Sequence, residues 1–379
     1  MSGLVIFGTR PEAIKLAPMV ANIRGAQPAI DIGVVCTGQH AEIMTQTLNA
    51  LDLVVDENLN LMQRDQTPME VVERTIVSLT ERYASERPDW VLVQGDTATA
   101  FAGALFGYLG ESTVIHLEAG LRTHDIHEPW PEEGFRQEIA RLAGLHLAPY
   151  PCARENLLNE GIEPDSIQVI GNSGLDSQDG MLAQIADDDT AWLPNGDFVL
   201  VTLHRRENLG ERLEATCREL ISTLDAYPDL QILWPVHPNP KVRSTAFEFF
   251  GDRKDRVMLS EPLDYPKFLH AQRAAKFVVS DSGGVQEEAA SLGTRVAIVR
   301  EKTERPDAVD LGLTRIVGAD ATGLVDAVND FMATPVDPVS VAKWRALQGN
   351  GNAGAAAATA LLNKIGLIRR SANGPEEMP

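Results

Sequence analysis

The segment Phe277-Val278-Val279-Ser280-Asp281-Ser282-Gly283-Gly284-Val285-Gln286-Glu287-Glu288 contains the signals of one complete structural unit. Its first four residues form an apolar run that is typical of a buried strand. Two glycines then leave the backbone accessible, and the residues after them have the pattern of a helix start. A strand that turns directly into a helix is the repeating unit of α/β proteins, so this segment predicts a parallel sheet covered by helices.

Short apolar runs of the same kind recur along the chain and alternate with longer amphipathic segments. The first series of expected strands is Leu4–Phe7, Ile32–Cys36, Trp90–Val93, Thr113–Leu117, Leu145–Ala148 and Ile167–Ile170. The second series is Phe198–Leu203, Gln231–Trp234, Val257–Leu259, Phe277–Ser280, Arg295–Val299 and Arg315–Val317. Several runs are continuous rather than alternating, as expected for parallel strands that are buried on both faces. The clearest helical pattern places Val72, Ile76, Leu79 and Tyr83 on one face.

The two series of strands predict two similar, doubly wound α/β domains. A chain of 379 residues exceeds the usual size of one hydrophobic core. We expect an N-terminal Rossmann-like domain over residues 1–172 and a C-terminal one over residues 173–357. An alanine- and leucine-rich helix at about residues 358–370 is expected to pack back on the first domain. Residues 371–379 are polar and are expected to form a flexible tail.

The composition is that of an ordinary globular protein, with 44% apolar and 23% charged residues. The formal net charge of −21 argues against a nucleic-acid partner or an anionic membrane surface, because both require basic surface. Three scattered cysteines are too few for a disulfide framework or a zinc site. No apolar run has the length of a membrane helix, which is about 20 residues. We therefore expect a cytoplasmic protein.

Carboxylates, basic groups and prolines are concentrated between His116 and Glu133, directly after an expected strand. Loops at strand ends are where rigid scaffolds usually carry catalytic residues. A glutamate at the edge of a buried strand, such as Glu118, is a candidate acid or base. The sequence is equally compatible with a solvated loop that is held by salt bridges.

Two other strand ends in the N-terminal half carry candidate residues. Gly8 permits a close approach of the backbone to an anion, and Arg10 and Lys15 add positive charge beside it. A solvated turn is the alternative for that segment. Asp96 follows the run Trp90–Val93 and could cap the next helix through its carboxylate or project into the expected crevice between the domains. Taken alone, its position favours the cap.

Two strand ends in the C-terminal half complete the candidate set. His204 follows the first expected strand of the second series and is a candidate for proton transfer or phosphate recognition. His237 lies among prolines, which favours a rigid structural turn. The segment Ser282–Gly284 offers consecutive N–H groups and a helix dipole to a diphosphate, and Glu288 could accept hydrogen bonds from ribose hydroxyls. A helix that is merely capped by Asp281 or Ser282 is the alternative. No metal-ligand spacing, dinucleotide fingerprint or Walker loop is present.

With these segments assembled, the chain resembles the bacterial non-hydrolysing UDP-N-acetylglucosamine 2-epimerases. The shared motifs occur in order along nearly the whole chain. They are FGTRPEAIKLAP at Phe7–Pro18, TGQH at Thr37–His40, QGDT at Gln94–Thr97, HLEAGLRT at His116–Thr123, PWPEE at Pro129–Glu133, HRREN at His204–Asn208, PVHPNP at Pro235–Pro240, DSGGVQEEAASLG at Asp281–Gly293 and TERPDAV at Thr303–Val309.

The resemblance implies the glycosyltransferase-B (phosphorylase-like) fold, with two Rossmann-like domains that face a cleft. It implies reversible epimerisation at carbon 2 of UDP-GlcNAc to UDP-ManNAc, by elimination of UDP to a glycal and its re-addition. The resemblance also implies that the protein forms a homodimer and requires no cofactor. The implied catalytic residues are Asp96, Glu118, Glu132 and His204. The implied substrate-binding residues are Arg10, Lys15, Arg136, Phe268, Ser282, Gly283, Gly284, Glu288 and Arg305.

The sequence departs from the family pattern in two places. Gly134-Phe135 precedes Arg136, where the family commonly has an asparagine, so Phe135 is expected to alter the sugar pocket or the packing of the loop. Many members bind a second UDP-GlcNAc as an activator, in a neighbourhood that here includes Gln39, His40 and Arg206. Acidic residues, Glu42 and Asp65, replace neutral and basic groups in that pocket. Added negative charge near a diphosphate weakens its binding, so we predict weak or absent activation.

Three other functions remain open from the sequence. A hydrolysing epimerase would release ManNAc and UDP. An epimerase for a modified UDP-HexNAc is suggested by Phe135. A catalytically silent regulator would bind a UDP-sugar without exchange at carbon 2. Cell-envelope polysaccharide, teichoic-acid linkage or a secondary metabolite could each consume the product.

Overall fold

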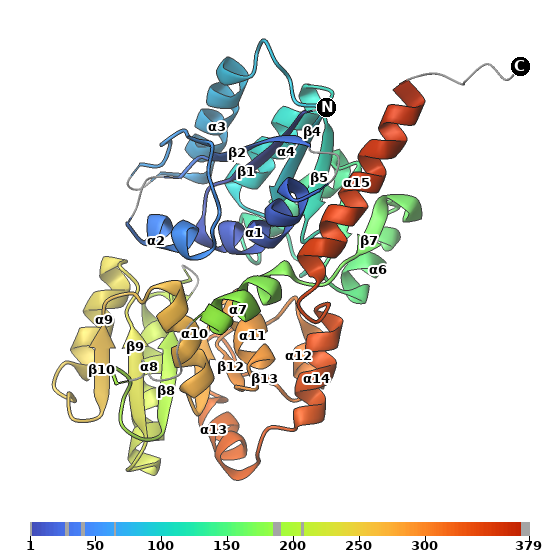
Figure 1. Ribbon diagram of the computed structural model, residues 1–379. Helices are drawn as coiled ribbons and strands as arrows, with labels where there is room; N and C mark the ends of the chain where they lie inside the picture. The colour runs from blue at the N-terminus through green and yellow to red at the C-terminus, as the bar shows by residue number, and fades with distance from the viewer. Residues whose placement is uncertain are drawn as a thin grey trace, which may run out of the picture. The chain divides into compact units, whose positions relative to one another are not determined.

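The structure is a computed structural model that describes residues 2–26, 30–38, 42–63, 66–184, 191–205 and 208–372. The chain folds into two compact units. Unit 1 consists of Met1–Ser177 and Leu347–Pro379, and unit 2 consists of Gln178–Ala346. Each unit contains a parallel sheet whose strands alternate with helices along the chain, which confirms the predicted α/β class (Figure 1). Residues 373–379 of the expected tail lie outside the described residues.

Unit 1 contains a parallel sheet of seven described strands in the order β3-β2-β1-β4-β5-β6-β7. The strands are β1 (Ser2–Phe7), β2 (Asp31–Cys36), β3 (Glu57–Asn58), β4 (Trp90–Gln94), β5 (Thr113–Leu117), β6 (Leu145–Ala148) and β7 (Ile167–Val169). The helices are α1 (Arg10–Arg24), α2 (Glu42–Ala50), α3 (Pro68–Arg82), α4 (Ala98–Leu109), α5 (Glu132–Leu142), α6 (Pro151–Asn159), α7 (Ser173–Gln184, which runs on into unit 2) and α15 (Ala353–Ala372). The two-residue edge strand β3 was not predicted, because two polar residues carry no apolar signal.

The central strands of unit 1 are buried on both faces. Consecutive residues of β4 belong to different cores, with Trp90 and Leu92 in one cluster and Val91 and Val93 in another. Because side chains alternate across a strand, these two clusters lie on opposite faces of the sheet. The Trp90 ring lies so close to Gly3 that a Cβ there would be 1.9 Å from it. Helices therefore cover both faces, as the continuous apolar runs predict.

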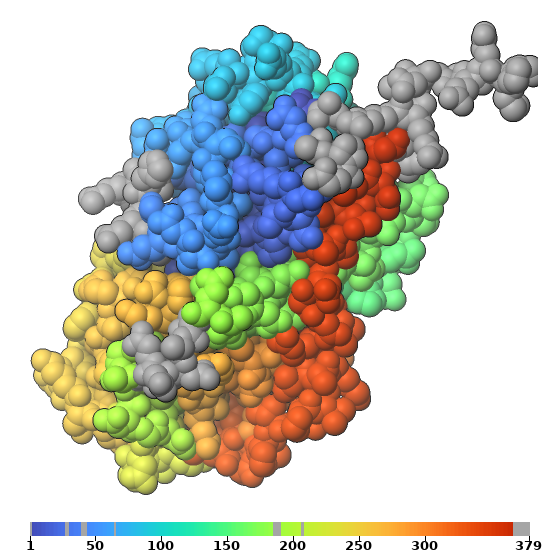
Figure 2. Space-filling model, viewed as in Figure 1, coloured from blue at the N-terminus to red at the C-terminus, as the bar shows by residue number. Residues whose placement is uncertain are grey.

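Helix α15 returns the end of the described chain to unit 1. It packs along α1, and in the space-filling view its red surface borders the blue surface of the N-terminal segment (Figure 2). Ala357, Ala358, Leu361 and Ile365 are buried in the same cluster as the β1 residue Phe7. This apolar stripe recurs every three to four residues, as a helix requires for burial of one face.

Unit 2 contains a parallel sheet of six described strands in the order β10-β9-β8-β11-β12-β13. The strands are β8 (Phe198–Thr202), β9 (Gln231–Pro235), β10 (Val257–Ser260), β11 (Phe277–Ser280), β12 (Val296–Ile298) and β13 (Thr314–Ile316). The helices are α8 (Glu211–Ala226), α9 (Pro240–Phe250), α10 (Tyr265–Ala274), α11 (Gly283–Ser291), α12 (Pro306–Asp310), α13 (Leu324–Ala333) and α14 (Pro338–Leu347). All strands predicted in the second series are present.

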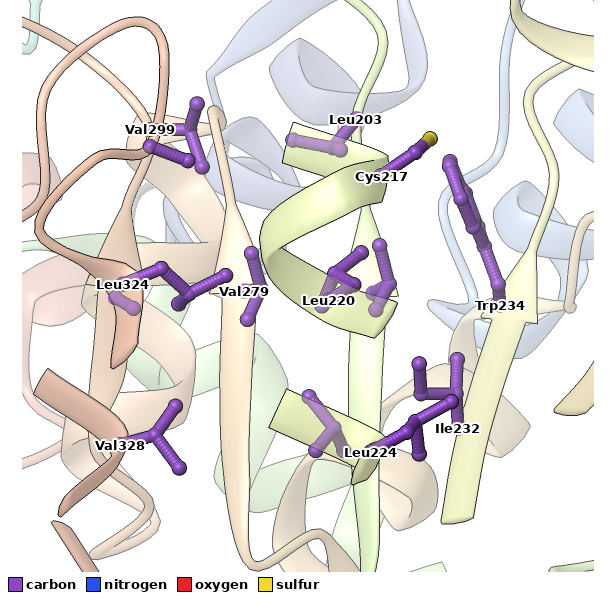
Figure 3. Packing of buried hydrophobic residues seen from close by; sticks show 14 of the residues in the cluster. Leu203, Cys217, Leu220, Leu224, Ile232, Trp234, Val279, Val299, Leu324 and Val328 are labelled. Atoms are coloured by element: carbon purple, nitrogen blue, oxygen red, sulfur yellow. The ribbon is translucent and has the colours of Figure 1, made fainter. Parts of the chain in front are cut away.

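One face of the unit 2 sheet packs against α8 and α13 (Figure 3). Leu220 and Leu224 of α8 and Leu324 of α13 meet the strand residues Val279 and Trp234 in this core. The opposite face carries a separate cluster that includes Phe198, Leu200 and Val278. The middle of each strand is therefore buried on both faces and requires apolar residues, whereas the strand ends can carry polar residues.

Candidate functional site

Three loops of unit 1 follow neighbouring strands at the same edge of the sheet. β1 pairs with β4, and β4 pairs with β5 so that Gln94 lies opposite Leu117. Because the strands are parallel, their carboxyl ends meet at one edge. Arg10, the first residue of α1, and the loop residues Asp96 and Glu118 follow these strands, so three of the residues predicted from sequence share this edge.

Glu118 adopts a backbone conformation that is unfavourable for a glutamate. Its φ is 69°, in the left-handed region, and its N–H donates to the carbonyl of Leu147 at 3.0 Å. The side chain accepts hydrogen bonds from the Lys15 ammonium and from the Gln94 amide. Backbone strain of this kind concentrates at functional sites, where the surrounding structure maintains it. The geometry therefore sets the direction of the Glu118 carboxylate.

The backbone of α1 at Lys15 is held by hydrogen bonds from α7. Ser173 Oγ donates to the carbonyl of Lys15 at 2.6 Å, and Ser177 Oγ donates to the carbonyl of Ile14 at 2.6 Å. These bonds tie the middle of α1 to the start of α7 within unit 1. The Lys15 side chain is 13% exposed and the Glu118 side chain 12%, so their ion pair is only partly accessible to water.

Asp96 does not cap helix α4, which corrects the role that its sequence position alone favours. The N-cap is Thr97, whose side-chain oxygen accepts a hydrogen bond from the N–H of Ala100 at 3.0 Å. The Asp96 carboxylate instead accepts a hydrogen bond from Arg136 of α5. Both residues can act as N-caps, and only the fold decides which one turns toward the helix.

The two adjacent glutamates of α5 have different environments. Glu133 is fully buried and accepts from the Thr123 N–H at 3.1 Å and the Gln137 amide at 2.9 Å. Its carboxylate also lies 3.3 Å from Nη1 of Arg136. Glu132 is the first residue of α5 and is partly exposed. Glu133 therefore fixes Arg136 and the preceding loop, and Glu132 is the more accessible carboxylate.

Glu12 is a buried carboxyl group that sequence reasoning missed. Its oxygens accept from the N–H groups of Gly8 and Thr9 at 3.1 and 2.8 Å and from the Thr97 hydroxyl at 2.9 Å. It thus joins the loop after β1 to the loop after β4. Burial raises the pKa of Glu12 to about 7, against the opposing effect of these hydrogen bonds. The capping-box spacing from Thr9 to Glu12 was the signal that could have found it.

His116 supports the loop that carries Asp96. Its Nε2 lies 2.8 Å from the carbonyl of Gly95, and the ring is fully buried. Burial lowers the pKa of His116 to about 3, so the ring is neutral and Nε2 carries the hydrogen that Gly95 accepts. Gly95 has a φ of 68°, in the left-handed region, which glycine adopts more readily than residues with a side chain.

Phe135 packs within unit 1. Its ring stacks on that of Phe101 in α4, with 5.1 Å between the ring centroids and 13° between the planes. The residue is partly buried. Of the two effects expected from sequence, this contact supports an effect on packing.

In unit 2, the two glycines singled out from the sequence begin helix α11. Ser282 occupies the N-cap position, but its side chain makes no capping hydrogen bond. The alternative in which Ser282 merely caps the helix is therefore wrong. A Cβ on Gly283 would lie 2.6 Å from Nη1 of Arg305. The guanidinium therefore lies directly against the first turn, where only glycine leaves it room. A helix N-terminus with an adjacent arginine is suited to a phosphate group.

Arg305 belongs to a buried network of four charges. Its Nε donates to Glu287 at 2.6 Å and its Nη1 to Glu304 at 3.2 Å. Arg300 also donates to both oxygens of Glu304, at 3.0 and 3.1 Å. The two acids and two bases are each less than 10% exposed. This network fixes the orientation of Arg305 before any ligand binds.

Glu288 is oriented by two groups from α10. The Tyr265 hydroxyl donates to it at 3.0 Å and the Gln272 amide at 2.9 Å. Phe268, from the same helix, is partly buried against the cluster that contains Leu200. The structure thus places Glu288, the predicted ribose-binding residue, on α11 and Phe268, a predicted substrate-binding residue, on the neighbouring helix α10.

His204 lies beside a buried acid that the sequence did not assign to it. Its Nδ1 is 3.2 Å from Oδ1 of Asp281, and its ring stacks on that of His237 with 5.7 Å between centroids. His204 is exposed at 40% of its side chain, whereas Asp281 is fully buried. The Asp281 carboxylate therefore serves His204 and does not cap α11. His237 belongs to a proline-rich turn, and its ring also contacts His204.

The positions expected to form a regulatory site, Gln39, His40 and Arg206, lie outside the described residues, as do Asp65 and the side chain of Glu42. Within the described ranges, no three or more His, Cys, Asp or Glu side chains form a group that could hold a metal ion.

The sequence matches the family described as UDP-N-acetylglucosamine 2-epimerase over residues 24–362. The chain belongs to this family. The UDP-N-acetylglucosamine 2-epimerase of Bacillus subtilis (strain 168) is 39% identical over 359 residues, which are 92% of each chain. The crystal structure of UDP-GlcNAc 2-epimerase from Neisseria meningitidis, bound to UDP-GlcNAc, has a TM-score of 0.89 at 34% identity. That match covers 96% of this chain and 100% of the other.

A more distant likeness bears on the fold alone. The lipopolysaccharide outer core galactosyltransferase WaaB, in its apo form, matches with a TM-score of 0.55 at 13% identity. It covers 96% of this chain and is itself covered completely. The chain therefore has the glycosyltransferase-B fold that the sequence resemblance implies, with two Rossmann-like domains. Among its described helices, none combines the length and apolar character that a membrane span requires.

Proposed function

We propose that the protein interconverts UDP-GlcNAc and UDP-ManNAc by inverting carbon 2, without net hydrolysis. The observation that carries this proposal is the pair of carboxylates at the ends of adjacent strands β4 and β5. Asp96 contacts a guanidinium, Arg136, and Glu118 contacts an ammonium, Lys15. The family membership gives the reaction class, and this pair gives the acid–base groups that carbon 2 requires.

The proposed reaction has two stages. In the first, a carboxylate removes the proton from carbon 2 while the bond between carbon 1 and the UDP oxygen breaks, which leaves a glycal and free UDP. In the second, UDP adds to carbon 1 and a carboxylic acid returns a proton to the other face of carbon 2. Two faces require two groups, and we assign these tasks to the set Asp96, Glu118 and Glu132. The oxidation state does not change, so the reaction requires no redox cofactor.

We further propose that unit 2 binds the UDP moiety. The N–H groups at Gly283 and Gly284 and the guanidinium of Arg305 match the charge of a diphosphate that leaves and returns. Glu288, held by Tyr265 and Gln272, accepts hydrogen bonds from the ribose hydroxyls. His204 donates to the diphosphate from the loop after β8. Arg10 of unit 1 is assigned to substrate binding on the ground of the family resemblance alone.

Incubation of the protein with UDP-GlcNAc in D2O tests the proposal. We expect UDP-ManNAc to form and deuterium to appear at carbon 2 of both UDP-sugars. The matched control is Glu118→Gln, which keeps the shape of the side chain but cannot transfer a proton. It should reduce the exchange rate by about 10²-fold or more. The same protein should still bind UDP, as measured by calorimetry.

The products distinguish the alternatives. Accumulation of free ManNAc and UDP in equal amounts would show a hydrolysing epimerase. Exchange with an acylated or otherwise modified UDP-HexNAc, but not with UDP-GlcNAc, would show a different substrate. UDP binding without exchange at carbon 2 for every UDP-HexNAc tried would show a silent binding protein and would reject the enzyme proposal.

We also propose a homodimer, on the ground of the family resemblance alone. Light scattering coupled to size-exclusion chromatography measures the mass in solution. A mass of one chain, 41.2 kDa, over the concentration range used for activity would reject the dimer.

A further inference from the structure

Asp281 is the acceptor for a converging set of donors from the loop after β8. Its carboxylate accepts the N–H of His204 at 3.1 and 3.2 Å and the N–H of Arg205 at 2.9 Å. The Asn208 amide donates to the same group at 3.2 Å and to the carbonyl of Val299 at 3.0 Å. The His204 ring completes the set through Nδ1, at 3.2 Å. A fully buried carboxylate thus holds both the backbone and the side chain of His204.

We infer that Asp281 is a positioning residue, which fixes His204 with a hydrogen on Nδ1 and leaves Nε2 as the nitrogen that acts on the substrate. The inference rests on the proposed function, in which His204 contacts the UDP-sugar. It goes beyond that proposal because it names the working nitrogen of the ring and the residue that selects it.

The chemistry of the two side chains selects this tautomer. An ionised carboxylate only accepts hydrogen bonds, so the ring nitrogen that faces it must carry a hydrogen. The opposite tautomer would direct a lone pair at a negative charge. Burial acts to raise the pKa of Asp281, but the interactions with His204 and with the backbone N–H groups of His204 and Arg205 outweigh it and lower the pKa. Asp281 therefore stays ionised at neutral pH.

Among the described residues, the ring of His237 also faces His204. Its Nδ1 accepts a hydrogen bond from the N–H of Asn239 at 3.2 Å, so its own hydrogen lies on Nε2 in the neutral form. Arg205, next in the chain, adds a positive charge nearby. Of these groups, Asp281 is the acid that faces Nδ1 of His204, at 3.2 Å.

The protonation state of His204 decides whether Nε2 attracts or repels the diphosphate. When His204 is protonated, Nε2–H can donate to a diphosphate oxygen while Nδ1–H remains bonded to Asp281. When His204 is neutral, Nε2 is an acceptor and repels the diphosphate. The strength of the interaction with departing UDP therefore depends on the charge that Asp281 supplies behind the ring.

The substitution Asp281→Asn tests this role with little change of shape. The amide oxygen can still accept the backbone N–H groups, but the amide nitrogen would donate to Nδ1 and transfer the ring hydrogen to Nε2. We expect kcat to fall by about 10²-fold or more while the KM for UDP-GlcNAc changes by less than about threefold.

The tautomer can be measured without any turnover. In protein labelled with ¹⁵N at its 8 histidines, the two ring nitrogens of each neutral imidazole give different shifts. The spectrum of His204→Gln assigns the signals of His204. We expect Nδ1–H in the wild-type protein and Nε2–H in Asp281→Asn. A wild-type neutral ring with its hydrogen on Nε2 would overturn the inference, even if Asp281→Asn failed to fold.

Asn208→Ala is the matched control, because it removes a different hydrogen bond to the same carboxylate without contacting the ring. It should leave Nδ1–H in place and keep kcat within about threefold of the wild-type value. Equal changes of tautomer and kcat in Asn208→Ala and Asp281→Asn would show that the effect comes from loop packing and would overturn the inference. Failure of wild-type exchange at carbon 2 would reject the proposed reaction and would leave the tautomer result intact, so the two failures are distinguishable.

Discussion

The Lys15 ammonium donates a hydrogen bond to the Glu118 carboxylate, although 103 residues separate the two in sequence. Lys15 comes from the second turn of α1, and Glu118 directly follows β5 at a φ of 69°. The unfavourable backbone conformation is therefore combined with a specific charge contact. This relationship directs the carboxylate toward the edge of the sheet where the candidate residues of unit 1 lie.

The backbone strain at Glu118 predicts an unusual order of stability among its variants. Glu118→Gly and Glu118→Ala both remove the contacts with Lys15 and Gln94, and both should lose exchange at carbon 2. Glycine accepts the left-handed conformation without a Cβ clash, so Glu118→Gly should be more stable than Glu118→Ala by about 1 kcal/mol. Urea unfolding monitored by circular dichroism measures the difference. Equal stability, or greater stability of the alanine variant, would contradict strain at this position.

The adjacent residues Glu132 and Glu133 should separate catalysis from stability. Glu133→Gln removes the negative charge from a buried ion pair with Arg136, and we expect a loss of about 3 kcal/mol in the free energy of unfolding. Glu132→Gln should lower the rate of carbon-2 exchange by about 10²-fold and affect unfolding much less. Urea unfolding and deuterium incorporation are measured on both variants. The reverse assignment of effects would show that Glu133 is the residue that reacts.

Glu12 predicts a pH dependence of stability in the range from about 4.5 to 7. Its folded-state pKa, about 7, lies above the ordinary glutamate value of 4.5, so the folded state binds the proton more tightly. Stability from this group is complete below pH 4.5 and is lost as the pH rises through 7. The shift corresponds to about 3 kcal/mol.

Glu12→Gln should remove this component, because the amide stays neutral at every pH. Unfolding by urea is compared at pH 5 and pH 8 for both proteins. The wild-type protein should lose more stability between these two values than the variant, by up to about 3 kcal/mol. An identical loss in the two proteins would mean that Glu12 is not buried as a protonated acid.

The Phe135–Phe101 contact predicts an energetic coupling between α4 and α5. Stacked aromatic pairs contribute about 1 kcal/mol beyond their burial, so the double-mutant cycle of Phe135→Ala and Phe101→Ala should give a coupling of that size. The KM for UDP-GlcNAc should change by less than about threefold in Phe135→Leu, since Phe135 acts in packing. A large change of KM with no coupling would instead assign Phe135 to the sugar pocket.

The fold was predictable because its signals are local. Continuous apolar runs such as Trp90–Val93 mark strands buried on both faces, and the glycine turn at Gly283 marks the start of α11. These signals act within a few residues of the chain. The edge strand β3 shows where they fail, because Glu57 and Asn58 pair with β2 through the backbone alone.

The partners of the candidate side chains were decided only by the tertiary structure. By sequence, both Asp96 and Thr97 can cap α4, and the choice depends on Arg136, 40 residues away. In the same way, Asp281 precedes α11 but serves His204, 77 residues earlier. Hydrogen-bond donors and charges that lie far apart in sequence meet at these positions, and no local pattern records which of them will meet.

The sequence by itself therefore determined the alternation of strands and helices, the strand ends that carry polar groups, and the family motifs. The tertiary structure decided which acids are buried, which cations neutralise them, and which residues hold Glu118 and His204 in place. The physical reason is that apolar periodicity is a property of a single segment. Burial and pairing of a charge depend on every segment that packs around it.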